Sequence, residues 1–245
     1  MISSKDRFGE AYFRHRARFP TAVFKGRDLS FLKFPFWDRC IRKRKGHGRL
    51  LDVGCAEGAL LRWAGRRSYQ GYGVDVSLPA LRIANRRNNK SEIIAGDVTS
   101  LPFKAEHFDA VTCFDVLEHI EDPLAGLRQV GACLKRDGIL VISVPNLDSC
   151  GLKWKGREWF GFRDTTHVSL LRESEWNDLL REAGFEAIDS FNDTLWDSPY
   201  FRHIPTLIQH AAFKPLLLVF YWTPIRVPRR LGENLYIVAR KVGER

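Results

Sequence analysis

Residues 50–61 read LLDVGCAEGALL, and this stretch decides which fold the chain adopts. Its apolar start, Leu50–Val53, predicts a short buried strand that ends at Gly54. Ala59–Ala64 predicts the start of a helix, so Gly54 and Gly58 belong to the turn between strand and helix. Glycine allows a ligand to come close to the backbone, and the amide groups of a helix N-terminus favour an anion. The stretch therefore predicts a strand–turn–helix unit that binds a ligand.

Strand and helix patterns alternate on the C-terminal side of this unit as far as about Asn146. Such alternation predicts right-handed β-α-β units and a parallel sheet with helices on both faces. Beyond Asn146 the alternation is looser, and we expect one more helix and two more strands. The expected strands are 72–76, 92–95, 108–114, 138–144, 185–191 and 234–241, and the expected helices are 78–87, 123–134 and 173–182.

A chain of 245 residues suits one sizeable α/β domain with appendages. We assign residues 1–48 to a basic N-terminal arm, in which 30–45 could form a helical cap, and residues 49–245 to the domain itself. Within the domain, a loop rich in Trp, Lys and Arg is expected at 147–172. An aromatic insert with several prolines is expected at 195–231.

The positive charge of the chain is concentrated in this arm. Residues 1–50 contain 14 Lys and Arg against four acidic residues, which gives 14 − 4 = +10, the net charge of the whole chain. The other 195 residues contain 25 basic and 25 acidic groups. This asymmetry predicts contact with an anionic partner, such as nucleic acid, a membrane surface or a phosphorylated substrate. A basic face that only increases solubility explains it equally well.

The cysteines and the apolar runs indicate the cellular compartment. The five cysteines show no C-x-x-C spacing, which excludes a disulfide framework or a zinc site of that kind and fits a reducing cytosol. The N-terminus lacks the apolar stretch of a signal peptide. The longest apolar run, Leu216–Trp222, has seven residues, whereas ~20 are needed to span a bilayer. We therefore expect a cytoplasmic protein.

Two carboxylates at the ends of later strands predict a nucleoside site. Asp75 lies 21 residues after Gly54, where an acid holds the ribose hydroxyls in folds that bind dinucleotides or S-adenosylmethionine (SAM). Asp97 ends the third strand and can accept a hydrogen bond from an adenine amino group, and Val98 can pack on the ring.

The spacing of the glycines favours SAM over NAD. Chains that bind NAD usually show G-x-G-x-x-G, whereas here the spacing is G-x-x-x-G, with Ala56 at the middle position and Glu57 beside the second glycine. A further carboxylate would repel a pyrophosphate, but the methionine end of SAM carries an amino group and a sulfonium.

Five segments taken together resemble the successive motifs of class I SAM-dependent methyltransferases. They are DVGCAEG at 52–58, GVDVS at 73–77, AGDVTSLPF at 95–103, FDAVTCFDVLEHIEDP at 108–123 and LKRDGILVISVPN at 134–146. The group that includes the ubiquinone-biosynthesis O-methyltransferases is the most similar. The resemblance covers about residues 48–192 and resumes at 233–241.

This resemblance implies an α/β fold, a Rossmann-like three-layer sandwich. Its seven-stranded, mostly parallel sheet has the order 3-2-1-4-5-7-6, with strand 7 antiparallel. The cofactor is SAM, and S-adenosylhomocysteine is the product. One departure is Ala56, which replaces the middle glycine of the commonest motif and adds a methyl group near SAM. The residues expected to bind SAM are Asp52, Gly54, Cys55, Ala56, Gly58, Asp75, Val76, Asp97, Val98 and Phe114.

Two histidines are candidates for a general base, which methyl transfer to a hydroxyl requires. His119 follows the fourth strand and His167 lies in the 147–172 loop, and histidine titrates near neutrality. Alternatively, His167 bonds within its own loop and His119 packs at a helix start.

Asp115, Glu118 and His119 have i, i+3, i+4 spacing, so one helical face could present all three to a divalent cation. Acids at a helix start usually interact with the helix dipole and solvent, so we assign no metal site.

We therefore expect a SAM-dependent methyltransferase that acts on a hydroxyl of a small-molecule, glycan or lipid-linked acceptor. Residues 153–160, KWKGREWF, together with the 195–231 insert, are expected to roof the acceptor site. The basic arm and the aromatic and arginine residues of the insert could rest on an anionic bilayer, which would place the protein peripherally on the inner membrane face. An apolar insert that packs on itself is the alternative.

Three other functions stay open. An NAD-dependent oxidoreductase is disfavoured because no Tyr-x-x-x-Lys or comparable hydride-transfer pair is present. A nucleic-acid methyltransferase that uses the basic arm is disfavoured because strand 108–114 is not followed by the Asn/Asp-Pro-Pro-aromatic signature of base amino-methylation. The third is a protein that binds SAM without catalysis.

Overall fold

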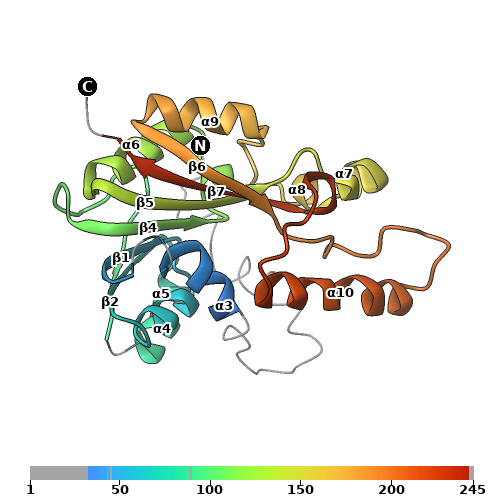
Figure 1. Ribbon diagram of the computed structural model, residues 1–245, viewed down its shortest axis with the longest axis horizontal. Coiled ribbons are helices and arrows are strands. Elements are labelled where there is room, and N and C mark those ends of the chain that lie inside the picture. The colour runs from blue at the N-terminus through green and yellow to red at the C-terminus, as the bar shows by residue number, and fades with distance from the viewer. Residues whose placement is uncertain (1–32, 43, 45, 89, 243–245) are drawn as a thin grey trace.

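The structure is a computed structural model of the chain (Figure 1), and it describes residues 33–42, 44, 46–88 and 90–242. Most of the predicted basic arm lies outside the described residues. The arm's described part is helix α3 (Phe34–Trp37), which continues into five residues of π-helix, η3 (Asp38–Arg42). Phe36 and Trp37 are buried, so this end of the arm packs onto the domain.

Seven strands form one sheet in the order β3-β2-β1-β4-β5-β7-β6. All neighbouring strands pair in parallel except β7, which is antiparallel to both β5 and β6. This confirms the strand order and the single antiparallel strand that the sequence predicts. The strands are β1 (Gly48–Val53), β2 (Tyr69–Asp75), β3 (Glu92–Ala95), β4 (Phe108–Phe114), β5 (Leu134–Pro145), β6 (Phe185–Asn192) and β7 (Asn234–Lys241).

Two of the helices that cover the sheet begin at side-chain N-terminal caps. The Ser77 hydroxyl accepts from the Ala80 amide at the start of one helix, and the Asp122 carboxylate accepts from the Ala125 amide at the start of another. Each of these helices also has proline in its first turn, where no amide donor is needed. The main covering helices are α4 (Ala59–Ala64), α5 (Leu78–Arg87), α6 (Pro123–Cys133) and α9 (Glu173–Glu182).

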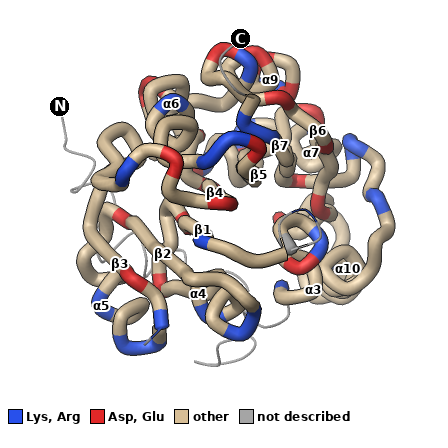
Figure 2. Tube along the Cα trace, turned by 60° about the vertical axis from the view of Figure 1, so that its left-hand side comes forward, with Lys and Arg blue, Asp and Glu red and all other residues tan. Residues whose placement is uncertain are grey.

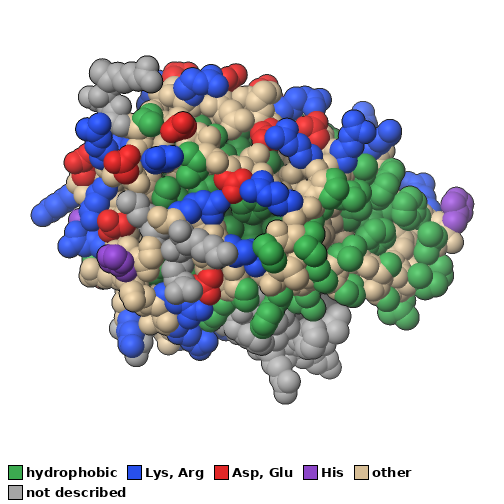
Figure 3. Space-filling model, viewed as in Figure 1, with side chains coloured by type: hydrophobic (Ala, Val, Ile, Leu, Met, Phe, Trp, Pro, Cys, Tyr) green, Lys and Arg blue, Asp and Glu red, His purple; other side chains and the backbone are tan. Residues whose placement is uncertain are grey.

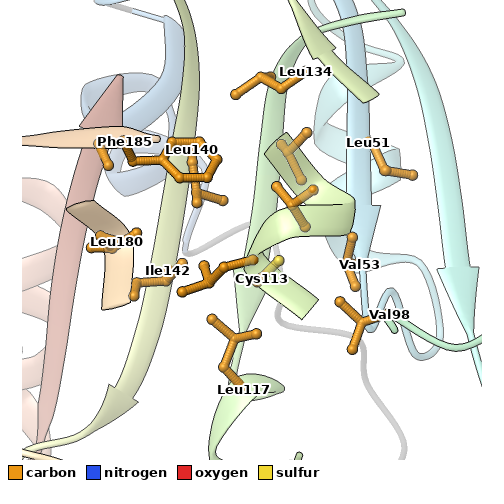
Figure 4. Close-up of a cluster of buried hydrophobic side chains, with 14 of the residues drawn as sticks. Leu51, Val53, Val98, Cys113, Leu117, Leu134, Leu140, Ile142, Leu180 and Phe185 are labelled. Atoms are coloured by element: carbon orange, nitrogen blue, oxygen red, sulfur yellow. The ribbon is translucent and has the colours of Figure 1, made fainter. Parts of the chain in front are cut away.

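The core has two large clusters because successive side chains of a strand point to opposite faces of the sheet. Leu51 of β1 belongs to the cluster under α6 and α9, which also contains Trp176 and Leu180. Figure 4 shows Leu180 and Phe185 of this cluster beside the β5 side chains. Leu50 belongs to the other cluster, which contains residues of α3 and α4. The result is three layers, as predicted.

The segments expected as a loop and an insert contain helices that the sequence analysis did not predict. Within 147–172 lie α7 (Cys150–Lys155), the short turn η5 (Gly156–Glu158) and α8 (Phe160–Arg163). Within 195–231 lies the 17-residue helix α10 (Thr206–Trp222), which contains Pro215. Its apolar residues show no helical alternation with polar ones, which is why the pattern did not indicate a helix. None of the helices in the described part of the chain has the length and apolar character of a transmembrane segment.

Candidate functional site

The turn between β1 and α4 requires glycine at two positions. Gly54 and Gly58 both have φ values in the left-handed region, 73° and 74°. A Cβ at Gly54 would lie 2.3 Å from Val116 Cγ2, and one at Gly58 would lie 2.3 Å from Asn88 Nδ2. From the sequence, these glycines are expected because they let a ligand approach the backbone. The structure adds a second cause, since the protein's own side chains fill the space on the Cβ side.

Asp75 connects the end of β2 to this turn. Its Oδ2 accepts a hydrogen bond from the Ala56 amide, and its Oδ1 accepts one from the Ser77 amide, both at 2.8 Å. Ala56 itself has a positive φ of 44°, so this bond holds the turn in a conformation that alanine rarely adopts. An ionised carboxylate has about four lone-pair sites, two on each oxygen, and these two bonds use one site on each oxygen. Val76, the next residue, is half-buried.

Asp52 lies under the turn, buried at the end of β1. Its Oδ1 accepts a hydrogen bond of 2.8 Å from the Thr112 hydroxyl on β4. Burial raises the pKa of Asp52 to about 7, the hydrogen bond from Thr112 opposes this change, and the negative charge of Asp75 adds to it. Burial likewise raises the pKa of the neighbouring Cys55 thiol. Asp52 can therefore change its charge near neutral pH, whereas Cys55 stays protonated.

The carboxylate of Glu57 forms an ion pair with Arg87 of α5. This pair weakens the charge argument made from the sequence, because the guanidinium offsets the negative charge that would repel a pyrophosphate. The preference for SAM over NAD therefore depends on other features of the chain.

Asp97 and Val98, expected at the adenine, and Phe114, expected at SAM through its backbone, occupy two environments. Asp97 is half-buried, and its Oδ1 accepts from the amide and the hydroxyl of Thr99 at 3.0 and 2.8 Å. Val98 is buried in the core cluster next to Gly126 of α6. Phe114 is half-buried, and the centroid of its ring lies 6.1 Å from the ring centroid of Tyr236. The protein itself thus surrounds much of the Val98 and Phe114 side chains.

The strand order brings these residues to one edge of the sheet. Asp97, Asp75, the 54–58 turn and Phe114 follow the carboxyl ends of β3, β2, β1 and β4, which are consecutive neighbours. Parallel sheets bind ligands in the crevice outside these carboxyl ends. A row of acceptors for adenine and ribose, followed by a glycine turn whose amides are mostly bonded within the protein, fits the adenosine and methionine parts of SAM.

His119 and His167, predicted as separate candidates, lie together. Their ring centroids are 4.8 Å apart. His119 Nδ1 lies 2.9 Å from the hydroxyl oxygen and 3.2 Å from the carbonyl oxygen of Thr166. His167 Nδ1 lies 2.8 Å from the carbonyl oxygen of Gly161, so the bond within its own loop that the sequence analysis considered is present.

These contacts fix which ring nitrogen carries the proton. The Thr166 hydroxyl donates to Oδ1 of Asp164, because a carboxylate can only accept. The hydroxyl and carbonyl oxygens of Thr166 then both accept from Nδ1–H of His119. The carbonyl of Gly161 imposes the same tautomer on His167. In their neutral forms, both histidines therefore have an unprotonated Nε2.

The helical face expected for Asp115, Glu118 and His119 does not form. Leu117–His119 is a single 3-10 turn, and Asp115 lies before it with a positive φ of 55°. The Asp115 carboxylate accepts from the Ser143 hydroxyl at 2.7 Å. The tight turn and the left-handed Asp115 remove the i, i+4 geometry of an α-helix. Instead, Glu118, His119 and His167 each offer one ligand atom, and these atoms lie within 4.8 Å of one another.

A buried carboxylate that the sequence pattern does not indicate joins the loop and the insert to β7. Glu233 is fully buried, and its Oε2 accepts from Trp159 Nε1 at 2.6 Å and from the Ser149 hydroxyl at 2.9 Å. Its Oε1 accepts from the Tyr200 hydroxyl at 2.5 Å. The signal was only an acid directly before a strand, and its partners lie 33 to 84 residues away in sequence.

Asp197 makes a second connection between the same segments. Its carboxylate accepts from Lys155 at 2.5 Å, from Arg163 at 2.9 Å and from the Phe160 amide at 3.1 Å. Asp197 and Lys155 are both buried at the side chain. The 147–172 segment and the start of the insert therefore form one fixed structure beside the carboxyl ends of the strands.

Comparison with known proteins identifies the family. A family model described as a methyltransferase domain matches residues 26–190, which is more than half of the chain. A ubiquinone biosynthesis O-methyltransferase from Alkalilimnicola ehrlichii is 32% identical over 124 residues, which are 49% of this chain and 50% of that relative. An uncharacterised protein from Methanocaldococcus jannaschii is 28% identical over 63% of this chain and 68% of its own length. The chain thus spans about half to two thirds of the length of these relatives.

Solved structures agree on the fold. A SAM-dependent methyltransferase from Archaeoglobus fulgidus superposes with a TM-score of 0.64 at 19% identity, covering 94% of this chain and 99% of that one. A second, from Clostridium acetobutylicum, also gives a TM-score of 0.64, at 13% identity, covering 95% and 100%.

The chain belongs to the methyltransferase domain family. It carries a class I SAM-dependent methyltransferase domain, and SAM is its cofactor. This confirms the family that the five sequence motifs predict. The individual SAM-binding and catalytic residues stay predictions, because neither the comparisons nor the fold test them one by one.

Proposed function

We propose that the protein transfers the methyl group of SAM to a hydroxyl oxygen of a small-molecule, glycan or lipid-linked acceptor. The observation that carries this proposal is the histidine pair with fixed tautomers beside the carboxyl end of β4. Two relatives named as ubiquinone biosynthesis O-methyltransferases, 32% and 29% identical, also support an oxygen acceptor.

On the cofactor side, each residue of the sheet edge has a distinct role in the proposal. Asp75 accepts from the ribose hydroxyls and Asp97 from the adenine amino group. The turn at Gly54–Gly58 contacts the methionine end of SAM along its backbone. Asp52, once ionised, stabilises the cationic amino group through its negative charge.

SAM supplies an electrophilic methyl carbon bound to a sulfonium, which is a good leaving group. The protein's own contribution is to hold the acceptor oxygen in line with that carbon at near-contact distance. A hydroxyl must also lose its proton as the new bond forms. His119 accepts this proton at Nε2, because Thr166 keeps the proton of the neutral ring on Nδ1. His167 lies next to it as the second candidate base.

The roof of the acceptor site consists of α7, α8 and the start of the insert. Trp159 and Tyr200 are fixed by Glu233, and Trp154 packs on Tyr200 with ring centroids 5.7 Å apart. Trp159 and Tyr200 are buried beneath the roof, whereas Trp154 is exposed and presents a flat apolar surface that suits a sugar ring or an aromatic acceptor.

The proposal is tested by incubating the protein with methyl-labelled SAM and a cell extract separated into lipid, glycan, RNA, protein and small-molecule fractions. We expect label in a lipid, glycan or small-molecule fraction, on an oxygen atom identified by mass spectrometry. His119→Gln should lower the rate roughly a hundredfold, since general bases contribute about that much or more. Asp75→Ala should abolish detectable transfer.

Three outcomes of this assay would contradict the proposal. Label on nitrogen or carbon would remove the hydroxyl acceptor, and label confined to RNA would favour the nucleic-acid alternative. Full activity of Asp75→Ala would remove the assigned cofactor site.

A further inference from the structure

Helix α10 presents an apolar surface to solvent. Every exposed residue from Leu207 to Trp222 is apolar, and the exposed fractions of Leu207 and Trp222 are 80% and 57%. The exposed positions recur at intervals of three and four residues, so they form one continuous face of the helix. The members of this face, here called the α10 face, are Leu207, Ile208, Ala211, Ala212, Pro215, Leu216, Leu218, Val219 and Trp222.

The opposite side of the helix is firmly attached to the protein. The buried Gln209 side chain bonds the backbone of Tyr200, Phe201 and Ile204 at 2.6 to 3.0 Å. Phe220 packs against Phe36 of α3 with ring centroids 5.2 Å apart. The α10 face therefore points outward because the other side of the helix is already bonded and packed.

The segment that contains α10 carries basic residues and no acidic ones. Residues 198–232 contain five Lys and Arg and no Asp or Glu. Arg226 and Arg229 form ion pairs with Asp189 and Glu173, yet both remain about two-thirds exposed. Figure 3 shows the apolar surface at the right of the molecule with Lys and Arg at its border, and in Figure 2 the α10 tube is mostly uncharged. The other basic residues are Arg202, Lys214 and Arg230.

We propose that the α10 face binds to an anionic lipid bilayer, with the helix lying in the membrane surface. Apolar side chains on one side of a helix and cations around them are what an anionic interface binds. The helix has 17 residues, fewer than the ~20 that span a bilayer, so it lies along the surface. A protein partner is a poorer match. It would need a broad apolar surface to cover the nine exposed apolar residues of α10, and acidic groups around that surface to pair with the basic residues of this segment.

Membrane binding would place the acceptor side of the protein at the bilayer. Figure 1 shows α7, α8 and α10 at the same end of the molecule. Tyr200, which precedes α10, bonds to Glu233 together with Trp159 of the roof. A lipid-linked hydroxyl could then reach the site without leaving the membrane. This last step rests on the proposed function, whereas the binding of the α10 face does not.

The test is co-sedimentation of the full chain with vesicles of phosphatidylglycerol and phosphatidylcholine, and with vesicles of phosphatidylcholine alone, without SAM or acceptor. We expect binding to the anionic vesicles that weakens as salt is added. The double variant Leu207→Glu, Ile208→Glu should bind at least roughly tenfold more weakly, since it replaces two exposed apolar side chains that would enter the bilayer. The control is Val242→Glu, which places the same acidic residue at an exposed apolar position outside α10. This variant should bind the anionic vesicles as wild type does.

Equal binding by the double variant, or no binding to anionic vesicles, would overturn the proposal. A second contrary outcome is a wild-type protein that binds neither kind of vesicle but forms a concentration-dependent dimer, which the double variant Leu207→Glu, Ile208→Glu does not form. The α10 face would then bind a second copy of the chain. Equal binding to neutral vesicles would remove the requirement for anionic lipid. Methyl transfer is measured separately, so a failure here and a failure of the proposed function are distinguishable.

Discussion

Asp52 is a buried carboxyl group that can ionise near neutral pH. Because burial raises its pKa to about 7, it holds a proton in the folded protein at lower pH and loses it as the pH rises. The free energy of unfolding therefore falls as the pH rises from about 4 to about 7. Over this range Asp52 is already ionised in the unfolded chain but still protonated in the folded protein. The methionine amino group of SAM is a cation, which would favour the charged form of Asp52.

We accordingly expect SAM to bind more tightly as the pH rises from about 6 to about 8, by up to roughly tenfold, and to level off above that range. Asp52→Asn should remove this pH dependence, since its amide does not titrate, while keeping an acceptor for Thr112. Calorimetric titration with SAM across the range measures both. A wild-type affinity that does not change with pH would contradict the assignment.

Thr166 positions His119 through a hydroxyl group, which gives a test by paired substitutions. Thr166→Val removes the hydroxyl at nearly constant shape, so Nδ1 of His119 retains only the carbonyl oxygen and the tautomer is held less firmly. We expect kcat to fall roughly tenfold with little change in KM for SAM. Thr166→Ser, which keeps the hydroxyl, should be close to wild type in steady-state kinetics. Equal losses in the two variants would mean that the hydroxyl plays no part.

For single residues, the sequence predicted positions in the fold better than it predicted which side chains contact one another. Asp75, Asp97 and the glycine turn could be located because strand ends in a parallel sheet share one edge. The contact between His119 and His167 could not, because it depends on how Thr166 folds back onto the turn after β4. The Glu57–Arg87 pair was missed for the same reason, since helix register decides which cation faces the turn.

Among the elements, the strands and main helices were predictable and the acceptor side was not. Strands 92–95, 108–114 and 234–241 have the predicted limits, because short apolar runs between turn residues have few alternatives. Helix α10 gave no signal because it is apolar on its exposed face. Helices α7 and α8 are four to six residues long and are held by buried carboxylates rather than by periodicity.

The bonds of Glu233 predict a large effect on stability. Glu233→Leu leaves the donors of Trp159, Ser149 and Tyr200 without their acceptor, so the free energy of unfolding should fall by roughly 3 to 5 kcal/mol. Tyr200→Phe removes one donor and should cost only about 1 kcal/mol. Denaturant titration measures both changes.

The control for this prediction is Glu182→Gln on α9. Glu182 pairs with Arg128 at the surface, where both side chains are more than half exposed, so its loss should cost less than about 1 kcal/mol. A Glu233→Leu variant as stable as this control would show that the buried bonds are not needed to hold the roof.

The molecule as a whole combines a predictable sheet with an insertion in its last connection. The chain leaves β6 at Asn192 and re-enters the sheet at Leu235, which is the register partner of Asn192. The residues between them form a connection whose two ends lie side by side in the sheet. Such a connection can change in length and composition without shifting any strand pairing. Diversification of what the protein recognises can therefore proceed at this site while the catalytic scaffold keeps its geometry.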